Sequence, residues 1–270
     1  MAVVSSMDRA VLSPRISATA TGNVLDAMKR EMERNVCLPT TFENEPTEDL
    51  ARDLAGRMPG DLDRIFFVAS GSEAVESVIM LARQWAIATG QPRRWKVIAA
   101  SRPIGGTLGA LAVTGDPALT GYFAEQMRSM PTIPSPTAYR DRDDLTMKER
   151  GIKYADMLKE QILAEGPQTV VAFIIERIGG AATNTLVAPD SYYTRIREIC
   201  DQYGILLIHD EVLSGVARTD RFLGGDHWNC RPNMIACLTE NAAAHGEDLL
   251  RGLRGLQARF PLIGDFAVKG

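Results

Sequence analysis

The sequence has few of the residues that mark a metal-binding, disulfide-rich or membrane protein. Its 270 residues include three histidines and four cysteines, and the cysteines lie far apart with no C-x-x-C pair. Neither a zinc site nor a disulfide framework is therefore predicted. The longest apolar runs, at 170–175 and 205–208, are far shorter than the roughly 18 residues that span a bilayer. We expect no membrane segment.

Excess positive charge and a targeting signal are lacking too. There are 30 Lys and Arg against 34 Asp and Glu, a net charge of −4, so the positive field that binds a nucleic acid backbone is missing. The first residues, MAVVSSMDRAVL, form neither a signal peptide nor an Arg-rich transit peptide. The 45% apolar and 24% charged composition is that of a globular protein. We expect a cytoplasmic globular protein without a nucleic acid partner.

Short apolar runs alternate with helical patterns along the chain. The runs predict strands at 65–69, 96–100, 169–175, 205–208 and 234–238. Apolar residues at helical spacing predict helices at 47–58, directly after Ser72, from Asp190 to Tyr203, and at 249–260. Thr47 and Asp190 are the expected N-caps, and Gly204 is the expected helix stop. Such alternation indicates a parallel α/β sheet, whereas the proline-rich stretch 131–144 predicts a surface connection.

Small residues stand where the first of these strands ends. Ser70-Gly71-Ser72-Glu73 joins it to the following helix, and the free N–H groups at a helix N-terminus form a site for an anion. A plain turn in which Ser72 caps the helix explains the same residues equally well. Ligands of open parallel sheets bind beyond the carboxyl ends of the strands, which is where this turn falls.

Acidic residues end two other predicted strands. Glu176 follows the strand at 169–175, and Asp210 and Glu211 follow the strand at 205–208. Adjacent strand residues point to opposite faces, so only one of Asp210 and Glu211 can face a site. A lone acid there is more often a capping or ion-pairing group, and the neighbouring His209 fits a packed or solvent-facing residue better than a metal ligand. Two carboxylates and an anion site at one sheet edge suit a phosphorylated, cationic ring.

Three segments carry longer motifs in a fixed order. Residues 65–74 (IFFVASGSEA), with Glu76 and 81–83 (LAR), match the pattern FF-x-x-SGSEA-x-E…LAR. Residues 197–212 (REICDQYGILLIHDEV) and the later Arg218-Thr219 match R-x-x-C-x-x-x-G-x-LLI-x-DEV…RTG. Residues 226–235 (DHWNCRPNMI) follow. Together these segments resemble class III aminotransferases, in which the third segment precedes the active-site lysine.

The resemblance implies a fold, a cofactor and site residues. The fold would be α/β, the three-layer, parallel-rich sheet of the large domain of pyridoxal 5′-phosphate (PLP)-dependent transferases of the aspartate aminotransferase type, here incomplete. PLP would be the cofactor, and Gly71 and Ser72 would hold its phosphate through their backbone. Asp210 would pair with the pyridinium nitrogen, Val212 would pack on one ring face, and Glu176 would lie near Asp210.

Two departures from the family bear on this site. Pro103 and Ile104 stand where the family usually has an aromatic residue, which stacks on the ring, and a histidine. After the last predicted strand the family has the lysine that binds PLP covalently and moves the substrate proton. This chain has Thr239 near that place and no lysine between Lys159 and Lys269. The resemblance thus provides no catalytic residue, and we predict no transamination by this chain alone.

Lesser departures lie close by. Arg177 follows Glu176 where the family commonly has proline, and Ala217 and Asp220 replace two glycines beside Arg218-Thr219.

The resemblance also predicts that parts of the family are missing. From residue 243 the sequence is similar to a later part of the family, so a block with the lysine and the next strand is absent after Leu238. We assign 1–45 to an N-terminal segment with a dimer-type helix near 21–32, and 46–242 to the large domain. Residues 243–270 would be a fragment that leads into a missing C-terminal small domain.

Three interpretations of function follow. The favoured one is a non-catalytic relative that forms a homodimer, or a heterodimer with a full-length homologue. The second is an active transaminase whose lysine segment is missing from this sequence; the inherited reaction moves an amino group between an amine or amino acid and a keto acid or aldehyde. The third, an enzyme independent of PLP, lacks a visible nucleophile and base. The amino donor and acceptor are not predicted.

Overall fold

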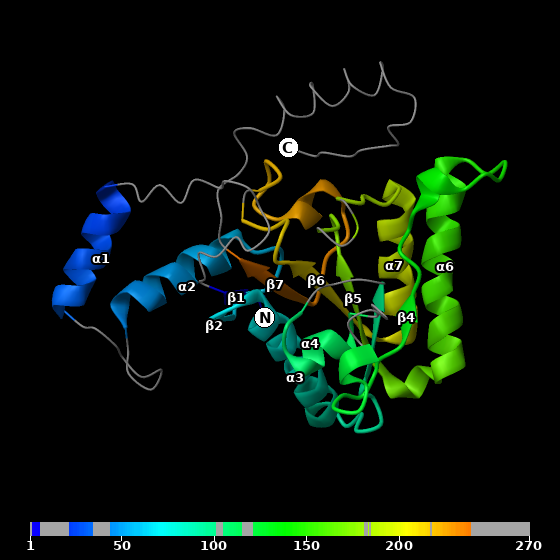
Figure 1. Ribbon diagram of the computed structural model, residues 1–270, viewed down its shortest axis with the longest axis horizontal. Coiled ribbons are helices and arrows are strands. Elements are labelled where there is room, and N and C mark those ends of the chain that lie inside the picture. The colour runs from blue at the N-terminus through cyan, green and yellow to red at the C-terminus, as the bar shows by residue number, and fades with distance from the viewer. Residues whose placement is uncertain are drawn as a thin grey trace, which may run out of the picture.

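The computed structural model describes residues 2–5, 22–34, 44–100, 105–114, 121–180, 183, 185–216 and 218–238, which form an α/β fold around one sheet (Figure 1). The described strands are all parallel and lie in the order β2-β1-β7-β6-β5-β3-β4. They are β1 Ala2–Ser5, β2 Ile65–Val68, β3 Lys96–Ala100, β4 Thr132–Ile133, β5 Val170–Glu176, β6 Leu206–Glu211 and β7 Met234–Leu238. The predicted fold class is confirmed.

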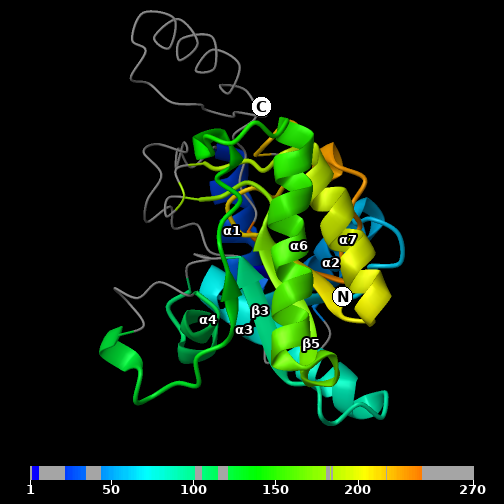
Figure 2. The same ribbon diagram turned by 90° about the vertical axis from the view of Figure 1, so that its right-hand side faces the viewer.

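Helices cover both faces of this sheet, as an all-parallel sheet requires. On one face α6 (Met147–Glu165) and α7 (Asp190–Tyr203) lie side by side, as Figure 2 shows. On the other face lie α3 (Gly71–Ala88) and the short α4 (Leu108–Ala112). At the β2 side α2 (Glu45–Arg57) packs on the sheet, and α1 (Gly22–Arg34) projects away from it in Figure 1.

The central strands β5 and β6 show why their sequences are continuously apolar. Phe173 and Ile175 of β5 point into the cluster under α6 and α7, whereas Ile174 points into the cluster under α3. Every residue of β6 is buried. Because both faces are covered, the usual alternation of apolar and polar residues is absent.

The predicted strands and the helix stop are confirmed, but two predicted N-caps are wrong. Asn44, not Thr47, caps α2, and its Oδ1 accepts the N–H of Thr47 at 3.5 Å. Pro189 precedes α7, and Asp190 instead accepts the indole N–H of Trp228 at 2.7 Å. Asp190 is already the first residue of α7 and therefore lies one position after the N-cap. Gly204 ends α7 at φ +59°, as predicted.

The proline-rich stretch 131–144 is more than a surface connection, which corrects the prediction. Thr132–Ile133 forms β4 at the sheet edge beside β3, and a 3-10 turn follows at Ala138–Arg140. Ile133 and Ala138 are 2% and 1% exposed. The segment belongs to the core because its apolar residues cover the end of α6.

Strand β1 and helices α4 and α6 were not predicted either. Helix α6 begins with a capping box between Thr146 and Glu149, and its buried stripe runs through Tyr154, Leu158 and Ile162, so the sequence did carry a helix signal there. Strand β1 is too short for a pattern, and only its pairing with β2 and β7 defines it. The predicted helix at 249–260 and the fragment 243–270 lie outside the described residues.

Candidate functional site

The loop after β2 places two free N–H groups at the carboxyl edge of the sheet. Ser70 caps α3 by accepting the N–H of Glu73 at 3.2 Å, and Glu73 accepts the N–H of Ala69 at 2.7 Å. The N-cap is therefore Ser70 and not Ser72. Among the described residues, the N–H groups of Gly71 and Ser72 have no hydrogen-bond partner. Together with the helix dipole they form an anion site of the expected kind.

The same loop is held against two neighbouring loops. The hydroxyl oxygen of Ser72 accepts the N–H of Gly106 at 2.7 Å. A Cβ on Gly71 would lie 2.7 Å from Cγ1 of Val212, so only glycine lets the backbone approach this valine. The loops after β2 and β6 and the segment before α4 thus meet at one edge.

Asp210 and Glu176 lie side by side at this edge. They are in register at the ends of β6 and β5, which places their side chains on one face of the sheet. Asp210 is 3% exposed and, among the described residues, accepts one hydrogen bond, from the N–H of Val212 at 3.1 Å. Glu176 is half-buried and accepts one from the same part of the chain, the N–H of Gly180 at 3.2 Å. Two neighbouring carboxyls shielded from water, with one such donor each, favour a proton or a cation between them.

The pKa shifts of the pair follow from this setting. Burial, reinforced by the charge of Asp210, raises the pKa of Glu176 well above its usual range. Burial likewise raises the pKa of Asp210, although the N–H of Val212 opposes the shift. The two carboxyls therefore hold a proton at pH values where an exposed acid has lost it.

On the opposite face of the same strands the acidic residue is paired internally. Glu211 accepts the hydroxyl of Ser214 and the N–H groups of Gly224 and Gly225, the last two at 2.9 and 2.6 Å. Arg177 donates to Nε2 of His209 at 2.8 Å and stacks on the rings of Tyr193 and Trp228. Burial, and then the charge of Arg177, lowers the pKa of His209 well below its usual value. His209 is packed, as predicted, and takes no part in the edge that faces a ligand.

The structure thus brings five predicted residues to one edge: Gly71, Ser72, Glu176, Asp210 and Val212. Thr239, Pro103 and Ile104 lie outside the described residues.

Glu76 is a supporting residue whose place the sequence motif alone did not explain. Its carboxylate accepts the hydroxyl of Thr107 and the N–H of Ala110 at 2.9 Å, which fixes the start of α4. Glu76 lies one turn after Ser72 on α3, so spacing on the helix was an available signal.

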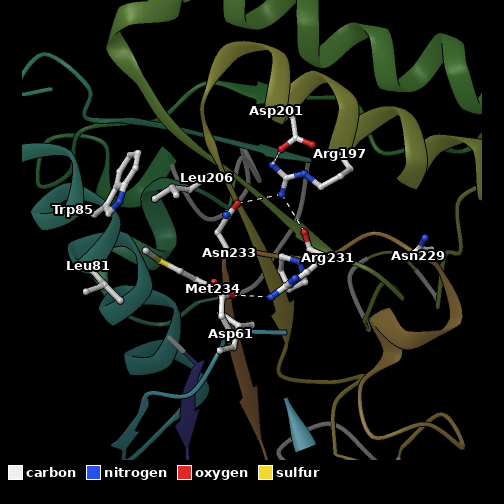
Figure 3. A pocket seen from close by; sticks show the side chains of 12 residues that line it. Asp61, Leu81, Trp85, Arg197, Asp201, Leu206, Asn229, Arg231, Asn233 and Met234 are labelled. Carbon is white, nitrogen blue, oxygen red and sulfur yellow. Dashed lines mark hydrogen bonds and ion pairs between the residues drawn. The ribbon is translucent and has the colours of Figure 1, made fainter. Parts of the chain in front are cut away.

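The large cavity shown in Figure 3 lies at the other end of the sheet. It has a volume of about 710 Å³, and it is lined by the first residues of β6 and β7, Leu206 and Met234. Its arginines are already paired: Arg231 with Asp61 at 2.8 Å and Arg197 with Asp201 at 2.6 Å. Because ligands of parallel sheets bind at the carboxyl ends, size does not make this cavity the candidate site.

The described part of the chain shows no sign of metal binding or of a membrane-spanning helix. No group of three or more His, Cys, Asp or Glu residues there could hold a metal ion. None of its helices is long and apolar enough to cross a membrane.

The class III aminotransferase family model matches residues 13–269. A probable aminotransferase of Mycobacterium tuberculosis is 38% identical over 197 residues, which cover 73% of this chain and 42% of that protein. A taurine–pyruvate aminotransferase of Bilophila wadsworthia is 28% identical over 315 residues, covering 92% of this chain and 67% of that protein. An alignment longer than the 270 residues of this chain contains segments of the relative that the chain lacks.

A solved structure shares the fold. The (S)-enantioselective omega-transaminase of Thermomicrobium roseum superimposes with a TM-score of 0.73 at 35% identity, over 78% of this chain and 47% of that one. This chain thus spans less than half the length of the M. tuberculosis relative and of this transaminase. Motifs, fold and family model agree, and the chain belongs to the class III aminotransferase family.

Proposed function

We propose that this chain binds PLP without a covalent bond at the carboxyl edge of its sheet and does not transaminate by itself. The observation that carries the proposal is the pairing of buried Asp210 with half-buried Glu176, at the same sheet edge as the free N–H groups of Gly71 and Ser72. PLP is the cofactor of the family, and its phosphate and ring nitrogen match these two features.

Each residue has a separate task in this proposal. The N–H groups of Gly71 and Ser72 donate to the phosphate, and the dipole of α3 favours its charge. Asp210 accepts a hydrogen bond from the protonated ring nitrogen, while Glu176 adds negative charge behind it. Val212, held in place against Gly71, covers one face of the ring. When bound, the ring supplies an electron sink for the substrate carbon.

The absence of a suitably placed lysine is the reason to propose no catalysis. The described lysines lie on α1, on α6 or at the start of β3, where Lys96 is paired with Glu165 at 2.7 Å. None of them forms a hydrogen bond or ion pair with Asp210, Glu176 or the Gly71–Ser72 loop at the carboxyl edge. Without an amine there, the described residues lack both the covalent anchor and the base that moves the substrate proton.

One observation favours a second function, an active transaminase whose lysine segment is missing from this sequence. The alignment to taurine–pyruvate aminotransferase includes positions that this chain lacks. In that case the complete protein would exchange amino groups between an amine and a keto acid, the two substrates that the relative's name gives. Sequencing the gene and its transcript between the codons for Leu238 and Thr239 separates the two: an in-frame lysine segment would establish the second function.

A dimer partner is part of the proposal. Met28 and Met32 on α1 are 57% and 63% exposed, and they lie one turn apart on one side of the helix. A second copy or a full-length homologue would cover this side. Light scattering during size exclusion tests it, because a monomer at micromolar concentration would contradict a dimer.

A cytoplasmic location is also proposed. Cys200, Cys230 and Cys237 are buried free thiols, as expected in a reducing compartment.

The test of cofactor binding is a titration with PLP, followed by absorbance and by quenching of tryptophan fluorescence. We expect saturable binding without the spectral band of a lysine adduct. Borohydride reduction and peptide mapping then check for a covalent bond. One stoichiometric pyridoxyl-lysine, together with turnover of an amine and pyruvate, would contradict the non-catalytic proposal; absence of binding would contradict the cofactor proposal.

A further inference from the structure

The strand β1 occupies an unusual place in the sheet. Residues 2–5 are far in sequence from both neighbours, yet they pair with β2 on one side and β7 on the other. In Figure 1 β1 lies between these two strands. Since β2 has no other strand neighbour among the described residues, β1 is the strand that hydrogen-bonds it to the sheet there.

Strand β1 lies in a slot between β2 and β7 that is covered on both faces of the sheet. Helix α3 contacts β1 and β7 on one face. On the other face a cluster of apolar residues joins α2 to β2 and β7, through Leu54 and Met58 of α2, Ile65 and Phe67 of β2, and Ile235 and Cys237 of β7. Parallel strands are about 4.8 Å apart, so β2 and β7 are separated by two spacings, about 10 Å. A strand fills this width.

The C-terminal end of β1 lies near the candidate cofactor site. Ser5, the last residue of β1, is in register with Val68 and Leu238. Val68 lies two residues before Ser70, which caps α3 beneath the free N–H groups of Gly71 and Ser72. Leu238 ends β7, whose neighbour β6 carries Asp210. Strands β1 and β7 lie between β2, which precedes the phosphate site, and β6, which carries Asp210. The distance between the phosphate site and Asp210 therefore includes the width of β1.

We propose that residues Ala2–Ser5 act as a spacer strand that completes the sheet and sets the distance between the Gly71–Ser72 anion site and Asp210. The slot between β2 and β7 holds one extended segment, which this chain supplies itself. Without it β2 either leaves the sheet or moves toward β7 by about one strand spacing. A shift of that size separates the phosphate site from its partners. The consequence for the cofactor rests on the proposed function, but the pairing of β1 does not.

Cysteine cross-linking tests the pairing directly. Val4 is in register with Cys237, whereas Val3 is in register with Ala236, and neighbouring positions in register share a face of the sheet. Adjacent strand spacing is within the Cα separation that a disulfide allows. We therefore expect the Val4→Cys variant, after oxidation with diamide, to form an intramolecular bond to Cys237, mapped by mass spectrometry. The matched Val3→Cys variant should form none.

Three results of this experiment are informative. A bond from Cys at position 4 to Cys237 within one chain supports the spacer strand. Equal cross-linking of both variants, or none of either, would overturn it. A Val4→Cys bond that forms only between two chains would overturn the intramolecular pairing, because the strand would then come from a second copy.

A second pair of variants tests the effect on the site. Val3→Pro removes a backbone N–H from a strand that is paired on both sides, and Val3→Thr keeps it. We expect Val3→Pro to raise hydrogen exchange at least tenfold in both β2 and β7 and to weaken PLP binding at least tenfold. Val3→Thr should change either by less than threefold.

The two proposals fail in different ways. Unchanged exchange in β2 and β7 after Val3→Pro would overturn the spacer strand, whatever PLP does. A wild-type chain that passes the cross-linking test but binds no PLP would contradict the cofactor proposal alone. Increased exchange with unchanged PLP affinity would overturn the claim that β1 sets the distance between the anion site and Asp210. If Val3→Pro does not fold, addition of a synthetic peptide of residues 1–8 to a chain without residues 2–5 gives the same readings.

Discussion

Strands β5 and β6 carry acidic residues on both faces of the sheet, and the two faces differ in how many hydrogen bonds these carboxylates accept. On one face Glu211 accepts three hydrogen bonds and lies near the Arg177 guanidinium. On the other face Asp210 and Glu176 accept one hydrogen bond each and lie beside one another. A carboxylate whose hydrogen-bond donors all come from its own loop stabilises that loop. A carboxylate that is shielded from water and keeps unused acceptor positions can instead bind a ligand. Adjacent residues of one strand, Glu211 and Asp210, thus have a structural role and a proposed binding role.

The largest effect should come from removing the paired acid. Glu211→Ala leaves the N–H groups of Gly224 and Gly225 and the hydroxyl of Ser214 buried without an acceptor. We expect the free energy of unfolding to fall by about 3–5 kcal/mol. The matched Glu176→Ala change should cost less than about 1 kcal/mol, because Glu176 has one donor. Urea denaturation of both variants measures this, and equal losses would remove the contrast between the faces.

The next effect is on the cofactor. Asp210→Asn removes the charge that would face the ring nitrogen, and we expect PLP affinity to fall at least tenfold. The free energy of unfolding at pH 8 should not fall, since the wild-type carboxyl is poorly satisfied there. Fluorescence titration and urea denaturation check the two parts. Asp201→Asn, at a 68% exposed side chain on α7, is the control; a similar loss of affinity in the control would contradict the assignment.

The pH dependence of stability should include a contribution from the Asp210–Glu176 pair, which paired variants can separate from that of Glu211. A raised carboxyl pKa means that the folded chain binds more protons than the unfolded chain between the ordinary pKa near 4 and the raised values. The contribution of the pair is therefore full below about pH 4 and is lost as pH rises through neutrality.

Urea denaturation of the wild type between pH 5 and 8.5 should show this decline. The double variant Glu176→Gln with Asp210→Asn should reduce the slope, leaving the part that comes from Glu211. An unchanged slope in the double variant would show that other groups cause it.

The smallest effect concerns the loop that carries Gly224 and Gly225 to Glu211. Asp220 in this loop is exposed and has φ +60°, a conformation that glycine adopts at least cost. We expect Asp220→Gly to raise the free energy of unfolding by about 0.5 kcal/mol and Asp220→Ala to lower it by a similar amount. Thermal unfolding of the two variants measures this; the opposite order would mean that the Asp220 side chain stabilises the loop.

Much of the candidate site could be predicted from sequence because it follows strands with strong apolar patterns. The positions of Gly71, Asp210 and Glu176 at strand ends were predicted, and their shared edge follows from parallel pairing. The N-caps were not, because capping depends on which partner a side chain reaches: Asp190 turns to Trp228, and Asn44 and Ser70 cap instead. The local sequence does not show which of several donors a side chain will reach in the folded chain.

The sequence by itself determined the family, the α/β class, the edge where a cofactor would bind, and the missing lysine, since each depends on residue identity and order. Only the tertiary structure decided which acid faces the site, because pairing register places Glu176 with Asp210 and leaves Glu211 to its own loop. It also decided that residues 2–5 complete the sheet, since four residues contain no pattern and their place depends on two strands more than 50 residues away.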